Sequence, residues 1–271
     1  MPIMEIEPQA TPGLEPASAP PQIPAEEKQL LAPAWHTVLM VVLMLANSAV
    51  TFMVSSRLTS RGAASITDRA RIIEYSATIA LELFLVALLW VGLRLRQTRI
   101  RDLIGGRWDT PEDFLLDLAI AFGFWIVAYG TLIGLSFALG LAKTSQIEEA
   151  KKLAQALAPH SAGALIIFIA LSITAGFVEE LVFRGYLQRQ IGALAGNIYV
   201  GLIVSAIIFG AGHGYEGTRR MLLIFIYGAM FGLLAMWRKS LRPGMMAHAW
   251  HDAFQGIVLF VAARSGVIPM R

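Results

Sequence analysis

Six polar residues stand inside or at the ends of apolar stretches of this chain, and their types can hold and transfer protons. They are Glu179, Glu180, Arg184, His213, His248 and Asp252. The first three share one stretch, the first histidine ends a second, and the last two lie four residues apart in a third. An acid within a membrane-length apolar stretch is costly unless it is paired or functional. We therefore expect these residues to form one buried polar site.

Helical geometry indicates which of these side chains can meet. Glu180 and Arg184 are four residues apart, so they share a helix face and can pair, whereas Glu179 points about 100° away. The pair is either a structural ion pair or a device that orients Glu179 or binds a substrate carboxylate. His248 and Asp252 also share a face, and a carboxylate beside an imidazole fixes its tautomer and raises its basicity.

Two other polar residues also lie in apolar stretches of the chain. His251 lies three residues after His248 and is the alternative polar member of that stretch, although we favour His248. Glu82 is isolated in an earlier apolar stretch, and we expect it to bond within the helix bundle.

The composition is that of a membrane protein. The 271 residues are 56% hydrophobic and 15% charged, with a mean hydropathy of +0.62, whereas soluble chains average about 25% charged residues. The absence of cysteine excludes disulfides and thiolate metal sites. No basic stripe interleaved with aromatic residues is present, so nucleic-acid binding has no support.

Repeated apolar runs of membrane length predict an all-α fold, a polytopic helical membrane bundle of about seven transmembrane helices. We expect a disordered Pro/Ala-rich tail at 1–33, because such a composition cannot bury a core. An amphipathic surface helix is expected at 144–158. The expected spans are 36–54, 72–93, 114–141, 162–188, 197–213, 220–237 and 244–262.

The basic residues predict the orientation only weakly. With the N-terminus inside, the inside segments carry 11 of the 22 lysines and arginines. The densest cluster, at 94–107, favours this orientation under the positive-inside rule. The polar site then opens towards the cytoplasm.

Three motifs in order carry a family resemblance: Glu179-Glu180-x-x-x-Arg184, Phe209-x-x-x-His213 and His248-x-x-x-Asp252. They resemble the CPBP (Abi) family of intramembrane proteases, which includes CAAX prenyl proteases and bacteriocin-processing enzymes. The resemblance covers about residues 160–260. It implies that 161–262 is a catalytic core preceded by N-terminal membrane helices and the amphipathic segment at 34–160.

The same resemblance implies an endopeptidase in a prokaryotic plasma membrane. It would hydrolyse a peptide bond in a membrane-associated peptide or protein, as in CAAX or leader-peptide processing. Its partners are then a peptide or membrane-protein substrate and the lipid bilayer, with no nucleic acid.

The resemblance also implies roles for individual residues. Glu179 and His213 correspond to the pair that activates water, and His248 and the residue at 252 to the groups that hold the carbonyl as it becomes an oxyanion. Eukaryotic prenyl proteases of the family typically have asparagine at the last position. Asp252 cannot donate to an oxyanion when ionised, so it is either protonated there or orients His248.

The role of a metal is open at this point. Two histidines and a glutamate are the ligand set of several catalytic zinc sites, so a divalent metal such as zinc is one route. In the metal-free route, Glu179 is the general base and His213 orients the water.

Two other classes of function compete with a protease. Acids and histidines in spans also build proton relays, so a proton-coupled transporter is one alternative. The polar residues lie mostly in the last four spans, however, and no repeated halves are visible. A non-catalytic, peptide-binding regulatory membrane protein is the other alternative. The sequence contains no His-Glu-x-x-His or Gly-x-Ser-x-Gly motif.

Overall fold

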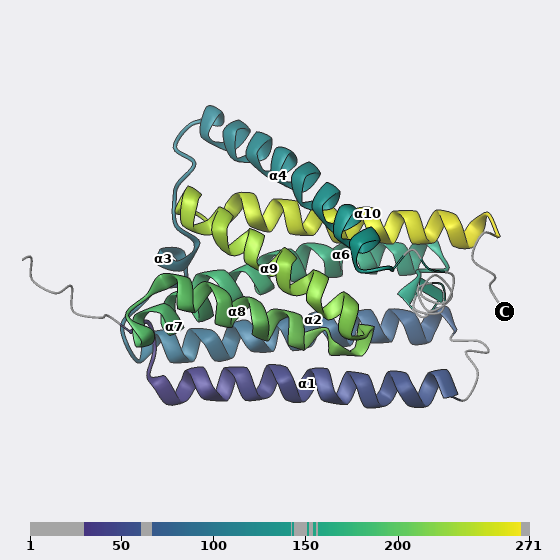
Figure 1. Ribbon diagram of the computed structural model, residues 1–271, viewed down its shortest axis with the longest axis horizontal. Coiled ribbons are helices and arrows are strands. Elements are labelled where there is room, and N and C mark those ends of the chain that lie inside the picture. The colour runs from purple at the N-terminus through teal and green to yellow at the C-terminus, as the bar shows by residue number, and fades with distance from the viewer. Residues whose placement is uncertain are drawn as a thin grey trace, which may run out of the picture.

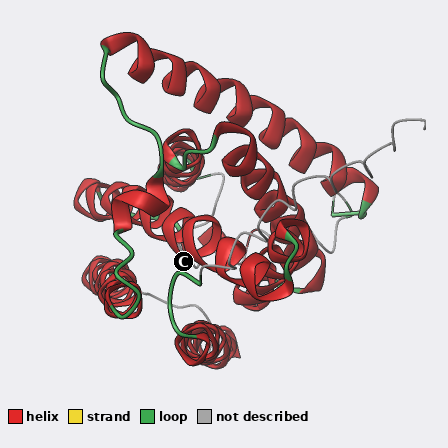
Figure 2. Cartoon of the chain, turned by 90° about the vertical axis from the view of Figure 1, so that its left-hand side faces the viewer, coloured by secondary structure: helices red, strands yellow, loops and turns green. Residues whose placement is uncertain are grey.

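Helices are the regular elements of this protein. A computed structural model describes residues 30–60, 67–141 and 157–266, together with residues 143, 151, 154 and 155. Within these ranges there is no strand, which confirms the predicted all-α class (Figure 2). The elements are α1 (Ala34–Ser60), α2 (Asp68–Arg94), α3 (Ile100–Ile104), α4 (Pro111–Ala138), α6 (Ala162–Glu179), η1 (Glu180–Leu187), α7 (Gln188–Ala195), α8 (Ile198–Gly212), η2 (Gly214–Glu216), α9 (Thr218–Arg238) and α10 (Arg242–Arg264).

Every predicted span coincides with a helix, or in the fourth case with the continuous run α6–η1–α7. Among the described residues, four helical segments are long and apolar enough to cross a membrane, and two shorter apolar helices lie in α1 and α8. This supports a polytopic helical bundle. The expected tail lies outside the described residues except for 30–33, and most of the expected helix at 144–158 also lies outside them. The four long segments are Asp68–Arg94, Pro111–Ala138, Ala162–Ala195 and Thr218–Arg238.

Short polar side chains set the starts of four helices. Thr67, Thr110, Ser161 and Asn197 each accept a hydrogen bond from a backbone N–H of the following first turn. Such caps satisfy backbone donors that have no partner within the helix. The boundaries of α2, α4, α6 and α8 are therefore encoded locally.

The basic segments meet at one end of the bundle, where α2 ends and α10 begins (Figure 1). Arg189 of α7 donates to the carbonyl of Asp102, and Arg242 of α10 donates to the carbonyl of Gly105. The backbone N–H of Leu241 donates to the carbonyl of Ile104 nearby. The sequence analysis placed these basic segments on the same side of the membrane, and in the structure they lie at the same end of the bundle.

Helix α6 is the centre of the arrangement, because it packs against both α2 and α10. Gly176 permits the second contact: a Cβ there would lie 2.6 Å from the backbone nitrogen of Ala249 and 2.8 Å from the carbonyl oxygen of Met245. Small residues allow such close backbone approach between membrane helices. In contrast, α4 slants away from the other helices at one side (Figures 1 and 2).

Candidate active site

The site begins at a change of helix type. Immediately after Glu179 the chain forms a π-helix, Glu180–Leu187, and all eight of its residues are buried. π-helical turns are rare and occur frequently at functional sites. We expected one uniform long helix here, and the structure has a continuous helical run with this insertion. The sequence did not reveal it, because the hydrophobic pattern of a short segment does not distinguish a π-helical turn from an α-helical one.

Glu180 and Arg184 form the expected ion pair in the interior. Nη1 of Arg184 donates to Oε1 of Glu180 over 2.8 Å, and the two residues are 3% and 1% exposed. Nη2 donates to the carbonyl of Gly228 over 3.0 Å. The guanidinium also lies 4.4 Å from the ring centroid of Phe209 and 5.2 Å from that of Phe231, which places it between two aromatic faces. Because its nitrogens bind protein acceptors, the geometry favours an ion pair over direct binding of a substrate carboxylate.

His248 is surrounded by three carboxyl groups. Its Nδ1–H donates to Oε1 of Glu180 over 3.0 Å. Its Nε2 lies 3.6 Å from Oε2 of Glu179 and 3.6 Å from Oδ2 of Asp252. Glu180 therefore fixes the imidazole tautomer, a task that the sequence pattern suggested for Asp252. A proton on Nε2 would point between the two remaining carboxyl groups.

His213 lies at the C-terminal end of α8. Its Nδ1–H donates to the carbonyl of Phe209 over 2.9 Å, so the neutral ring carries its lone pair on Nε2. The Phe209 ring separates the two histidines, at 5.0 Å from the His213 centroid and 6.2 Å from that of His248. His213 also interacts electrostatically with Asp252. The structure thus gathers all six predicted residues around one point.

His251 does not join this cluster. Its ring packs 5.0 Å from Tyr227 and 5.9 Å from Tyr129, and its Nε2 lies 3.0 Å from Nε2 of Gln255. The preference for His248 over His251 agrees with this placement.

Glu82 is the residue that sequence reasoning singled out but did not connect to the site. It is 8% exposed, and among the described residues its Oε2 has no hydrogen-bond partner. It interacts electrostatically with Glu179, His248 and Asp252. An acid in an apolar stretch was the available signal, but nothing in the sequence linked α2 to the motifs of the later helices.

The residues as placed do not fit a metal ion. Among the residues that the structure describes, no group of three or more His, Asp or Glu side chains has the arrangement of a metal site. The Nδ1 atoms of His213 and His248 both bind protein acceptors, so only their Nε2 atoms could coordinate a metal.

Two hollows flank the cluster. One, of about 290 Å³, lies at the basic end and is lined by residues that include Arg184, Gln188 and Leu241. The other, of about 460 Å³, is an apolar groove between α4 and α9 without any titratable lining residue. The rings of Phe124 and Phe231 pack together beside this groove, and Phe231 packs 5.3 Å from His248. The first hollow is the one that reaches a residue of the cluster.

A comparison with known protein families matches the part of the chain that contains this cluster. Residues 159–254 match the family described as type II CAAX prenyl endopeptidase Rce1-like. No curated protein and no solved structure matches the chain. The matched segment runs from the loop before α6 into α10 and contains all six predicted site residues, whereas Glu82 lies outside it. The match supports a CAAX-type intramembrane endopeptidase in general. Within this segment the chain is similar to the CAAX-type intramembrane proteases of the CPBP family.

Proposed function

We propose that the protein hydrolyses a peptide bond of a membrane-associated peptide or protein, using a water molecule activated by Glu179 and His213. The observation that carries the proposal is the environment of His248. Its imidazole is held at Nδ1 by Glu180 and faces Glu179 and Asp252 at Nε2. A buried set of acids and histidines that converges from several helices is typical of acid–base catalysis.

The attack on the substrate would begin at Glu179. Its side chain is 24% exposed, whereas that of Glu180 is 1% exposed and committed to Arg184 and His248. Glu179 therefore suits a general base that takes one proton from the water while the oxygen attacks the scissile carbonyl carbon. The lone pair on Nε2 of His213 accepts the second hydrogen of the water and orients it.

His248 would stabilise the tetrahedral intermediate. With Nδ1–H bound to Glu180, a proton on Nε2 makes the ring an imidazolium, whose N–H can donate to the developing oxyanion. Asp252, as a carboxylate 3.6 Å from Nε2, holds the ring and stabilises its charge. The intermediate then collapses, and Glu179 returns its proton to the leaving amine, which balances the reaction.

The substrate would be a CAAX-type or leader-type sequence that reaches the site from the basic end. The hollow of about 290 Å³ that Arg184 helps to line opens there. The basic residues at this end favour the cytoplasmic side under the positive-inside rule. We therefore propose a prokaryotic plasma-membrane protease whose site opens to the cytoplasm, and reagent labelling of single cysteines introduced at 96 and 239 in intact cells tests that orientation. Labelling of both positions by a membrane-impermeant thiol reagent added outside would reverse it.

The function is tested by peptide cleavage with the purified protein. The substrates are a fluorogenic peptide that ends in a farnesylated CAAX box, the same peptide without farnesyl, and a leader-type peptide. We expect cleavage of at least one substrate by the wild type and none by Glu179→Gln, with Glu74→Gln on an exposed part of α2 as the matched control. Assays with and without chelator test metal dependence. No cleavage by the wild type, together with proton-driven uptake in liposomes, would replace the protease by a transporter.

A further inference from the structure

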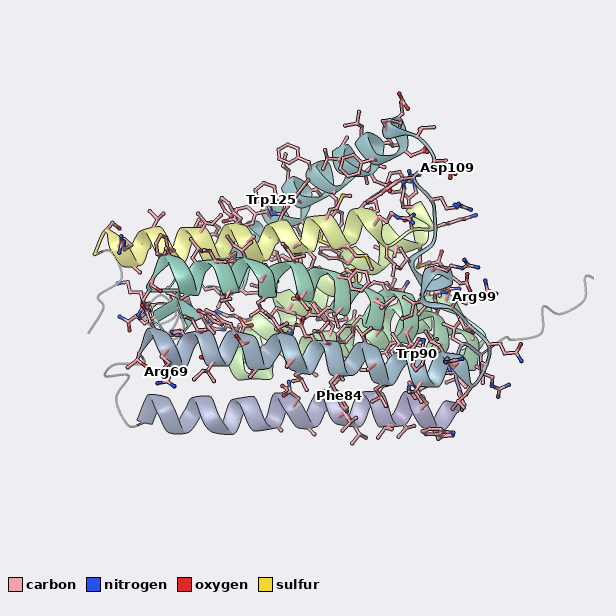
Figure 3. All side chains as sticks on the ribbon, turned by 180° about the vertical axis from the view of Figure 1, so that it is seen from behind. Arg69, Phe84, Trp90, Arg99, Asp109 and Trp125 are labelled. Atoms are coloured by element: carbon pink, nitrogen blue, oxygen red, sulfur yellow. The ribbon has the colours of Figure 1, made fainter. Side chains whose placement is uncertain are left out.

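The buried face of α2 carries an acid that the proposed mechanism does not use. The buried residues of this helix form one stripe, and Glu82 lies in the middle of it. Exposed residues lie on the other sides of the helix, among them Phe84 and Trp90 (Figure 3). The carboxyl group of Glu82 is therefore directed into the protein, where an unpaired acid is expensive.

Contacts between α2 and α6 show how far along the bundle Glu82 lies. Both helices begin at the same end, because Arg71 and Tyr75 of α2 donate to the backbone carbonyls of Gln155 and Leu157, just before α6. The Tyr75 ring packs 5.2 Å from that of Phe168 in α6.

Counting along the two helices from this contact locates Glu82 relative to the site. Seven residues after Tyr75 comes Glu82, and seven residues after Phe168 comes Ala175. Glu179 is one helical turn further, about 6 Å along the axis at 1.5 Å per residue. Glu82 therefore lies within about one turn of the proposed general base, on the helix that covers α6. This agrees with its electrostatic interaction with Glu179, His248 and Asp252.

One oxygen of this carboxyl group is buried and available. Oε2 of Glu82 has no hydrogen-bond partner among the described residues, in a residue that is 8% exposed. Buried polar atoms in native proteins are nearly always bonded, so an exception calls for an explanation. Among the described residues nothing donates to this oxygen, so it is open to a donor from a bound molecule.

A peptide that enters a membrane supplies such a donor. Its backbone N–H groups lose their water and must find acceptors in the protein. We propose that Glu82 is a substrate-binding residue, whose Oε2 accepts a hydrogen bond from a backbone N–H of the peptide beside the scissile bond. This inference rests on the proposed function, and it adds a contact from α2, outside the segment shared with the family.

The test uses two substitutions that separate binding from structure. Glu82→Leu keeps the side-chain size but removes both oxygens, whereas Glu82→Gln keeps one acceptor oxygen. With the farnesylated fluorogenic peptide, we expect Glu82→Leu to raise KM roughly twofold to tenfold, the equivalent of one hydrogen bond. We expect kcat to change little and Glu82→Gln to recover most of the loss. The melting temperature of Glu82→Leu should stay or rise, because the substitution removes an unpaired buried acid.

A second measurement makes the result independent of catalysis. In the Glu179→Gln background, binding of the same labelled peptide is titrated with and without Glu82→Leu, and Kd should rise by a similar factor. Glu74→Leu, on the same helix at an exposed position, is the control and should change neither Kd nor melting temperature. An unchanged Kd, or a lowered melting temperature with unchanged KM, would assign Glu82 a structural role and overturn the inference. A wild type that binds the peptide through Glu82 but does not cleave it would overturn the proposed function instead.

Discussion

The buried ion pair between Glu180 and Arg184 offers a sharp test of how the site is built. Glu180→Gln keeps the shape of the side chain but removes its charge. The substitution leaves Arg184, 3% exposed, with the Gly228 carbonyl and aromatic faces but without an anion. The same substitution weakens the bond that holds Nδ1 of His248.

The expected cost follows from burial. Removing one partner of a buried ion pair typically lowers the free energy of unfolding by about 3–5 kcal/mol, because a charge is left uncompensated. For a chain of this size, 1 kcal/mol corresponds to about 2–4 °C, so the melting temperature should fall by roughly 6–20 °C. Replacing both partners removes the uncompensated charge as well. The double variant, Glu180→Gln with Arg184→Gln, should therefore recover a large part of the loss.

Thermal unfolding of the wild type, both single variants and the double variant in the same detergent gives the complete cycle. A coupling between the two substitutions of about 1 kcal/mol or more would support the pair. Glu112→Gln, at an exposed position in the first turn of α4, controls for the loss of a glutamate charge as such. A Glu180→Gln variant with wild-type melting temperature would refute the reasoning, since it would mean that Arg184 needs no anion.

Four further substitutions test the chemistry and the packing. Glu179→Gln and His213→Ala should each lower the rate of peptide hydrolysis by about 10²–10⁴-fold or more, because the lost step is proton transfer; full activity in either purified, stable variant would remove that residue from the mechanism. Asp252→Asn should lower the rate, since asparagine lacks the charge that stabilises an imidazolium. The pH–rate profiles of wild type and variant measure this, and undiminished activity at neutral to mildly alkaline pH would make position 252 an oxyanion donor. Gly176→Ala places a Cβ against the backbone of α10 and should destabilise the protein by about 1–3 kcal/mol, measured by thermal unfolding. Gly134→Ala, which meets nothing within 4 Å, should be tolerated, and equal melting temperatures for the two glycine variants would argue against the close contact of α6 and α10.

The helices and their approximate ends could be predicted from the sequence. Apolar runs, capping residues such as Thr110 and Ser161, and the four-residue spacing of Glu180 and Arg184 are local signals. A capping bond or an i,i+4 pair depends on residues within one turn, so it forms largely independently of the rest of the fold. The six polar residues could also be recognised as a set, because each of the three motifs that contain them is a short local pattern.

The tertiary structure decided which of those residues bind one another. Glu180, rather than Asp252, holds Nδ1 of His248, because α6 and α10 approach closely at Gly176 and bring the two side chains together. That distance depends on the fit of two helix surfaces, which no single stretch of sequence contains.

Two features beyond the motifs also required the tertiary structure. The eight residues of η1 are all buried, and their local pattern does not distinguish a π-helix from an α-helix. Glu82 lies 97 residues before Glu179 in the chain, and only the packing of α2 on α6 brings it to the site. The sequence thus determined which residues are too polar to leave unpaired in an apolar helix. The packing of α2, α6 and α10 decided which of them meet, because contacts between helices depend on shapes and distances that local patterns do not specify.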